Sequence, residues 1–162
     1  MSRHDEIATL IPHQGSMCLL ERVLEWDAEH IVLATTTHRS AENPLHCGGR
    51  LRALHLCEYA AQAMAVHGEL IARAAGSHAS PGMLVSLREV ELTRAYVEDL
   101  PGELRVAAVQ LLAASGSWQY AFTVQHDGEL LARGRAAIVA QRLPAGSRDE
   151  AGAPTPRAPA SR

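Results

Sequence analysis

Residues 50–75, RLRALHLCEYAAQAMAVHGELIARAA, decide the fold. This stretch has no proline and one glycine and is rich in leucine and alanine, which predicts one helix about 39 Å long at about 1.5 Å per residue. Its main apolar stripe consists of Leu51, Leu54, Cys57, Ala61, Met64 and Ala65. Further apolar residues cover much of the remaining circumference, namely Leu56, Ala60, Ala63 and Val66. A helix that is apolar most of the way round is expected to be buried.

Strand-like segments lie on both sides of this helix in the sequence. Alternating apolar and β-branched residues predict strands at 17–26, 30–37, 82–92, 104–112, 118–126 and 129–139. Asp127-Gly128 between the last two is a strong hairpin signal. The small residues Ala132, Gly134 and Ala136 share one face, which predicts a close approach of the helix there. Two strands, one helix and four strands predict an α+β domain in which an antiparallel sheet wraps around one long central helix.

The chain has 162 residues and a formal net charge of −3, which predicts a single domain over residues 1–141. From residue 144 onward there is no large apolar side chain, and proline, alanine and arginine dominate. We therefore expect residues 142–162 to form a disordered tail.

Composition excludes several classes of function. All fifteen basic residues are arginine, so lysine Schiff-base chemistry and a P-loop lysine are excluded. The mildly acidic chain offers no broad positive field for nucleic acid. Three cysteines without a CxxC pair fit neither a disulfide framework nor a zinc ribbon. Without a basic signal-peptide start or an apolar run of about 18 residues, the protein is expected to be cytoplasmic and not to enter a membrane.

Two polar residues stand out against this apolar plan. Glu58 lies in the middle of the helix, where burial would raise its pKa and favour an acid role, although a position on the helix surface fits equally well. His13 lies on a turn before the first predicted strand, where a scaffold can hold it against a pocket. His55 and Glu58 have a metal-ligand spacing, but no second pair completes a site, so neither a metal nor another cofactor is expected.

The sequence gives little support for a serine or cysteine nucleophile. The sequence has no GxSxG motif, and the carboxylate of Glu58 beside Cys57 would weaken that thiol as a nucleophile. A buried core thiol is the better interpretation of Cys57.

Residues 11–20 (IPHQGSMCLL), residues 58–64 (EYAAQAM) and residues 100–104 (LPGEL) together resemble the hot-dog fold 3-hydroxyacyl-(acyl carrier protein) dehydratases. The resemblance extends over about residues 7 to 140 and is strongest to the branch associated with aryl polyene pathways. It implies a dehydration that gives a trans-2-enoyl thioester. His13 would remove the α proton and Glu58 would protonate the departing β-hydroxyl.

The resemblance also implies how the substrate is bound. In the family the histidine and the glutamate meet across a dimer interface. A helix N-terminus would offer amide donors to the thioester oxygen. Here Arg52-Ala53 replaces the family's usual Pro-Gly pair, and Gly48-Gly49 lies earlier. Gln62 would face the same pocket and orient Glu58, or serve only as an interface amide. The candidate substrate-binding residues are Gln62, Ala53, Gly49 and Met17.

The implied partner is an acyl carrier protein, which is acidic and would meet an arginine patch. The candidate contacts are Arg50, Arg52 and Arg133. The chain is expected to act as a homodimer or as a hetero-oligomer with another hot-dog subunit. Two other functions remain open. One is a hot-dog thioesterase, which would not need His13, and the other is a non-catalytic partner of a second dehydratase chain, suggested by the altered helix entry at Arg52-Ala53.

Overall fold

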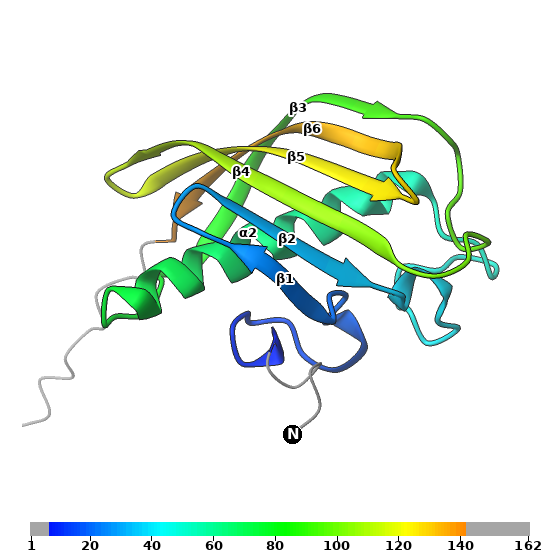
Figure 1. Cartoon of the computed structure of the whole chain (residues 1–162), viewed down its shortest axis with the longest axis horizontal. Helices are drawn as coiled ribbons and strands as arrows, with labels where there is room; N and C mark the ends of the chain where they lie inside the picture. Colours follow the sequence, from blue (N-terminus) through cyan, green and yellow to red (C-terminus); the bar gives the residue numbers. More distant parts are fainter. Residues whose placement is uncertain (1–6, 142–162) are drawn as a thin grey trace, which may run out of the picture.

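A computed structural model describes residues 7–141 of the chain (Figure 1). Its elements, in chain order, are η1 (Gly15–Met17), β1 (Arg22–Trp26), β2 (His30–Thr35), η2 (Thr37–Arg39), η3 (Ala53–His55), α2 (Leu56–Ala74), β3 (Gly82–Leu92), β4 (Leu104–Ala114), β5 (Ser117–His126) and β6 (Glu129–Ala140), where η marks a 3-10 turn. The strands form one sheet in the order β1-β2-β4-β5-β6-β3, and every neighbouring pair is antiparallel. The predicted tail at 142–162 lies outside the described residues.

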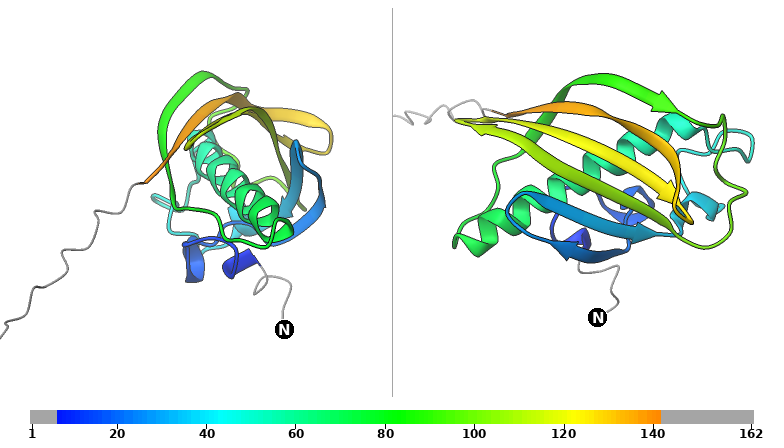
Figure 2. Two further views of the ribbon diagram at one scale, coloured as in Figure 1. Left: turned by 90° about the vertical axis from the view of Figure 1, so that its left-hand side faces the viewer. Right: turned by 45° about the horizontal axis from the view of Figure 1, so that its top comes forward.

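The sheet curves around α2, as the view along the helix in Figure 2 shows. The helix packs mainly on β4, β2 and β5. Leu56, Ala60, Ala63 and Val66 are fully buried between helix and sheet. The predicted α+β arrangement, with an antiparallel sheet wrapped around one long helix, is therefore confirmed.

The helix begins later than the sequence predicts. Residues 50–53 do not join it, because they pair with a neighbouring segment: the Ala53 N–H donates to the Ala95 carbonyl at 2.9 Å. The regular helix starts at Leu56, after a 3-10 turn. Leu54, predicted within the apolar stripe, lies on that turn and is 56% exposed.

Gly134, one of the small residues of β6, serves a different contact from the predicted one. A Cβ on Gly134 would lie 2.8 Å from Phe122 Cζ and 3.2 Å from Val90 Cγ2. Phe122 on β5 and Val90 on β3 therefore fill the space beside Gly134, and the missing side chain admits neighbouring strands rather than the helix. The reason is strand register, because Phe122 is the residue directly opposite Gly134 on β5.

The thiols of Cys18 and Cys57 are buried and free, whereas Cys47 is free and exposed. Burial raises the pKa of Cys18 and of Cys57, so both thiols stay protonated at neutral pH. No helix in residues 7–141 is long and apolar enough to cross a membrane.

The two glycines Gly134 and Gly68 predict opposite effects of alanine. Gly134→Ala should lower the free energy of unfolding by about 1–3 kcal/mol, because the new methyl overlaps the Phe122 ring. Gly68→Ala, in the interior of α2 with open space around its Cβ, should raise it by about 0.5–1 kcal/mol. Urea unfolding of both variants checks the pair, and equal stability of Gly134→Ala and the unmodified protein would contradict the packing described.

Candidate active site

His13 and Glu58 lie side by side in one chain. The Nε2 atom of His13 is 3.3 Å from Oε1 of Glu58, and each side chain is 34% exposed. His13 lies in the segment before η1, and Glu58 lies in the first turn of α2. The other ring nitrogen of His13, Nδ1, is buried without a hydrogen-bond partner among the described residues. Nε2 is therefore the ring nitrogen placed to exchange a proton with Glu58 or with a bound molecule.

The family resemblance implies a histidine and a glutamate that meet across a dimer interface. Within the single chain described here His13 and Glu58 already lie 3.3 Å apart. The physical reason is that the segment after His13 is fixed to the helix that carries Glu58.

Gln62 makes that connection, and it is completely buried. Its Oε1 accepts the Leu19 N–H at 2.9 Å, and its Nε2 donates to the Met17 carbonyl at 2.8 Å and to Glu58 Oε1 at 3.1 Å. Both amide protons are used in this way. Gln62 therefore orients the Glu58 carboxylate and holds residues 17–19 against the helix.

The other predicted substrate contacts are engaged elsewhere or lie apart. The Met17 carbonyl is taken by Gln62, and the Ala53 N–H donates to Ala95, so neither group is free for a substrate in this conformation. Gly49 follows Gly48 in a tight turn where both residues have a positive φ, 59° and 76°. Glycine tolerates this left-handed backbone without strain.

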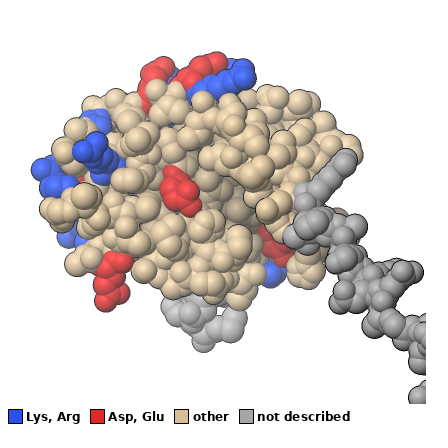
Figure 3. Space-filling model, turned by 180° about the vertical axis from the view of Figure 1, so that it is seen from behind, with Lys and Arg blue, Asp and Glu red and all other residues tan. Residues whose placement is uncertain are grey.

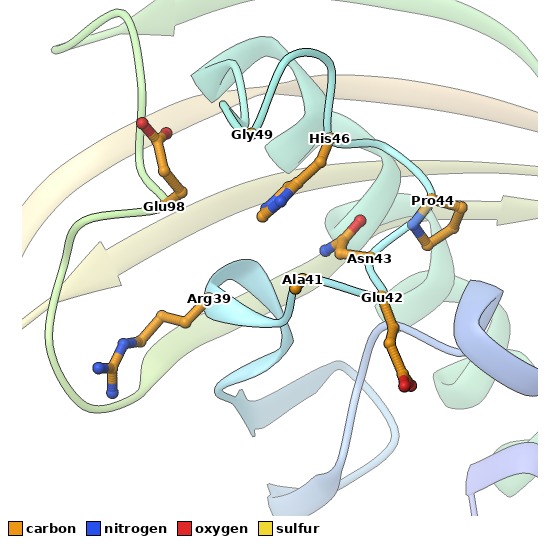
Figure 4. Close-up of a pocket in the computed structure, with 8 residues that line it drawn as sticks. All are labelled: Arg39, Ala41, Glu42, Asn43, Pro44, His46, Gly49 and Glu98. Carbon is orange, nitrogen blue, oxygen red and sulfur yellow. The ribbon is translucent and has the colours of Figure 1, made fainter.

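Gly49 lines a separate open cavity of about 670 Å³, shown in Figure 4. Arg39, Asn43, His46 and Glu98 also line it, and neither His13 nor Glu58 does. The structure thus brings Gln62 and Met17 to the His13–Glu58 pair but does not bring Gly49 there.

The three candidate carrier contacts differ in how free they are. Arg50 forms an ion pair with Glu98, and its guanidinium lies 3.9 Å above the Tyr96 ring. Arg133 makes a forked pair with Glu91, with hydrogen bonds of 3.0 and 2.9 Å. Arg52 is exposed and makes no ion pair with any residue between 7 and 141. Of the three arginines, Arg52 is therefore the one whose charge is not paired with a carboxylate among these residues.

The described part of the chain contains no cluster of side chains that could bind a metal ion. Across residues 7–141, no three His, Cys, Asp or Glu side chains come close enough together to hold a metal ion. What the pair of His13 and Glu58 offers is proton transfer: a basic ring nitrogen beside a carboxyl group.

Sequence reasoning missed the polar residues behind this pair. Asn43 is buried, and its Nδ2 donates to the hydroxyl of the buried Tyr59 at 2.8 Å. A tyrosine in the middle of a helix predicted to be buried was the available signal, because a buried hydroxyl needs a partner.

Comparison with protein families gives a match over residues 5–145 to the ApeP-like family, described as ApeP dehydratase. A comparison with curated proteins gives no match.

Solved structures with the same fold include three from different organisms. The dehydratase heterocomplex ApeI:P from Xenorhabdus doucetiae is 23% identical, covers 84% of this chain and 91% of its own, and has a TM-score of 0.75. AziG from S. sahachiroi is 17% identical over 83% of this chain and 99% of its own, with a TM-score of 0.58. A hypothetical thioesterase with coenzyme A from Streptococcus pneumoniae TIGR4 is 10% identical over 74% and 84%, with a TM-score of 0.54. These likenesses confirm the hot-dog fold.

The bonds of Gln62 predict a stability effect. Gln62→Ala should lower the free energy of unfolding by about 1–3 kcal/mol, because it leaves the buried Leu19 N–H and Met17 carbonyl without partners. The exposed Gln119 on β5 supplies the control, and Gln119→Ala should change stability by less than about 0.5 kcal/mol. Chemical denaturation measures both, and equal effects would mean that Gln62 does not hold residues 17–19.

Proposed function

Because the chain belongs to the ApeP-like dehydratase family, we propose that it removes water from 3-hydroxyacyl thioesters on an acyl carrier protein and forms trans-2-enoyl thioesters for aryl polyene biosynthesis. The observation that carries this proposal is the 3.3 Å contact between His13 Nε2 and Glu58 Oε1. An elimination needs a base for the α proton and an acid for the β-hydroxyl, and this contact puts one of each within reach of the same small molecule.

In the proposed reaction His13 acts as the base and Glu58 acts as the acid. His13 Nε2 takes the α proton, and the electron pair of the C–H bond forms the double bond as the β C–O bond breaks. Glu58 gives its proton to the departing hydroxyl, which leaves as water. The positive end of the α2 dipole lies at the turn that bears Glu58, and it favours the negative charge that develops on the thioester oxygen.

The contact also allows the site to reset. After the elimination His13 carries an extra proton and Glu58 lacks one. Transfer of that proton from Nε2 to Oε1 across 3.3 Å restores both groups. The α proton thus becomes the next acidic proton, and the cycle consumes no proton from solvent.

The hot-dog thioesterase is the weaker alternative. A carboxylate that activates water for hydrolysis does not require a histidine beside it, whereas His13 contacts Glu58 directly here. A non-catalytic role has one observation in its favour, because the Ala53 N–H at the helix entry is already used by Ala95.

A second hot-dog chain is the proposed partner in the assembly, since the relative from Xenorhabdus doucetiae is a dehydratase heterocomplex. The edge strand β3 supports this idea. Its Met83 and Val85 are 50% exposed, and Leu84 and Leu87 are about 40% exposed. Figure 3 shows that the molecule seen from behind is largely uncharged, with an acidic group near the centre of this face and other charges at its rim. Apolar edges of this kind are covered in stable assemblies. Arg52 is the proposed first contact for the acidic carrier.

His13→Ala and Glu58→Gln should each lower the rate of dehydration at least about 100-fold, because each removes one of the two proton-transfer groups. Mass spectrometry of a 3-hydroxyacyl carrier-protein thioester follows the loss of one water. The pair His30 and Glu25, 3.9 Å apart on the β1–β2 hairpin, supplies matched controls, and His30→Ala and Glu25→Gln should keep the activity. Release of free acid by the unmodified protein would support the thioesterase, and activity only with an added second chain would support the partner role.

The β3 edge gives a separate prediction about assembly. Leu87→Lys should weaken association measured by native mass spectrometry of the full chain, alone and with a co-expressed hot-dog partner, because a charge would enter an apolar contact. Leu112→Lys, at a comparably exposed leucine on β4, should leave association unchanged. Unaltered assembly of Leu87→Lys would show that β3 is not the interface.

A further inference from the structure

Behind the catalytic pair lies a buried hydroxyl that the proposed reaction does not use. Tyr59 follows Glu58 in α2 and is fully buried. Its hydroxyl accepts a hydrogen bond from Asn43 Nδ2 at 2.8 Å and lies 3.1 Å from Thr37 Oγ1. Burial raises the pKa of Tyr59, so the hydroxyl keeps its proton at neutral pH.

Thr37 joins Tyr59 to the backbone of Leu19. The single hydroxyl proton of Thr37 is shared between the Tyr59 hydroxyl at 3.1 Å and the Leu19 carbonyl at 2.6 Å. The Tyr59 hydroxyl therefore accepts hydrogen bonds from both Asn43 and Thr37. Asn43, Tyr59, Thr37 and the backbone of Leu19 form one connected hydrogen-bond network.

The backbone of Leu19 is held from both sides. Its carbonyl also accepts the Thr35 hydroxyl at 2.6 Å, and its N–H donates to Gln62 Oε1 at 2.9 Å. Gln62 in turn donates to Glu58 at 3.1 Å. Two residues of α2 thus hold the segment that leads back to His13: Gln62 directly, and Tyr59 through Thr37.

We propose that Tyr59 is a positioning residue which, through Thr37 and Leu19, sets the separation of His13 from Glu58. The inference rests on the proposed function only for its kinetic consequence, because the geometry itself belongs to the free protein. A phenylalanine would fill the same volume without reaching Thr37 or Asn43. The hydroxyl is therefore the part of Tyr59 that does the positioning, and a small shift of reacting groups is enough to slow a reaction strongly.

The kinetic test compares two buried tyrosines. Tyr59→Phe should lower kcat about 10- to 100-fold and leave KM within about twofold, because binding groups stay and only the catalytic spacing changes. Tyr120→Phe is the matched control: Tyr120 is also buried, and its hydroxyl lies 3.0 Å from His67 Nδ1 in the core between α2 and β5. It should lower Tm by a similar amount and leave kcat unchanged. An equal loss of kcat in both variants would overturn the proposal.

Thr37 supplies a conservative rescue. Thr37→Val removes the hydroxyl that joins Tyr59 to Leu19 and should reproduce the loss of kcat, whereas Thr37→Ser keeps the hydroxyl and should keep kcat within about twofold of the unmodified protein. A Thr37→Ser protein as slow as Thr37→Val would show that the threonine methyl, and not the hydrogen bond, matters.

A readout without substrate separates this inference from the proposed function. The imidazole ¹⁵N and ¹H chemical shifts of His13 report its contact with Glu58, and Glu58→Gln defines their values when the carboxylate is absent. Tyr59→Phe should move the His13 signals toward those values, and Tyr120→Phe should not. If the unmodified protein fails to dehydrate the thioester, the proposed function fails while the shifts still decide the positioning. Unchanged His13 signals and unchanged kcat in Tyr59→Phe would overturn the positioning role of Tyr59.

Discussion

The amide of Gln62 is the interaction on which the rest of the site depends. A polar side chain inside a helix that is buried against a sheet has to find partners, because an unpaired buried amide costs more free energy than its hydrogen bonds return. Gln62 finds them in Met17 and Leu19, which are far away in sequence. These hydrogen bonds fix the chain just after His13. The second amide proton of Gln62 remains, and it is donated to Glu58. The hydrogen-bonding requirement of a buried amide thus sets the geometry of the His13–Glu58 pair.

Local pattern was sufficient to predict most of the fold. The alternating runs match β2 to β6 within a few residues, and Asp127-Gly128 forms the expected tight turn between β5 and β6. The two exceptions have one cause. β1 begins at Arg22 rather than at residue 17, and α2 begins at Leu56 rather than at residue 50. Before β1, the backbone of Leu19 is hydrogen-bonded to the side chains of Gln62 and Thr35. Before α2, the backbone at the helix entry is hydrogen-bonded to the backbone of residues 95–97. Pairing between residues so far apart in sequence leaves no periodic signal.

The sequence singles out the two residues of the candidate pair but not their geometry. Proline before His13 and a carboxylate within an apolar helix are visible as anomalies in sequence, and the structure brings these two side chains together. What the sequence lacks is the path between them. The roles of Tyr59, Thr37 and Asn43 depend on three hydrogen-bond distances that no spacing rule contains. Likewise, a count of arginines cannot separate Arg50 and Arg133, which form ion pairs, from Arg52, which forms none within residues 7–141.

The contact between His13 and Glu58 within one chain has a consequence for assemblies of this protein. On the proposed function, a pair carried by one chain would need no residue from a second subunit to complete it. A second chain that covers the β3 edge would then supply no proton-transfer group. Such a chain would be free to diverge toward recognising carriers or shaping the acyl pocket.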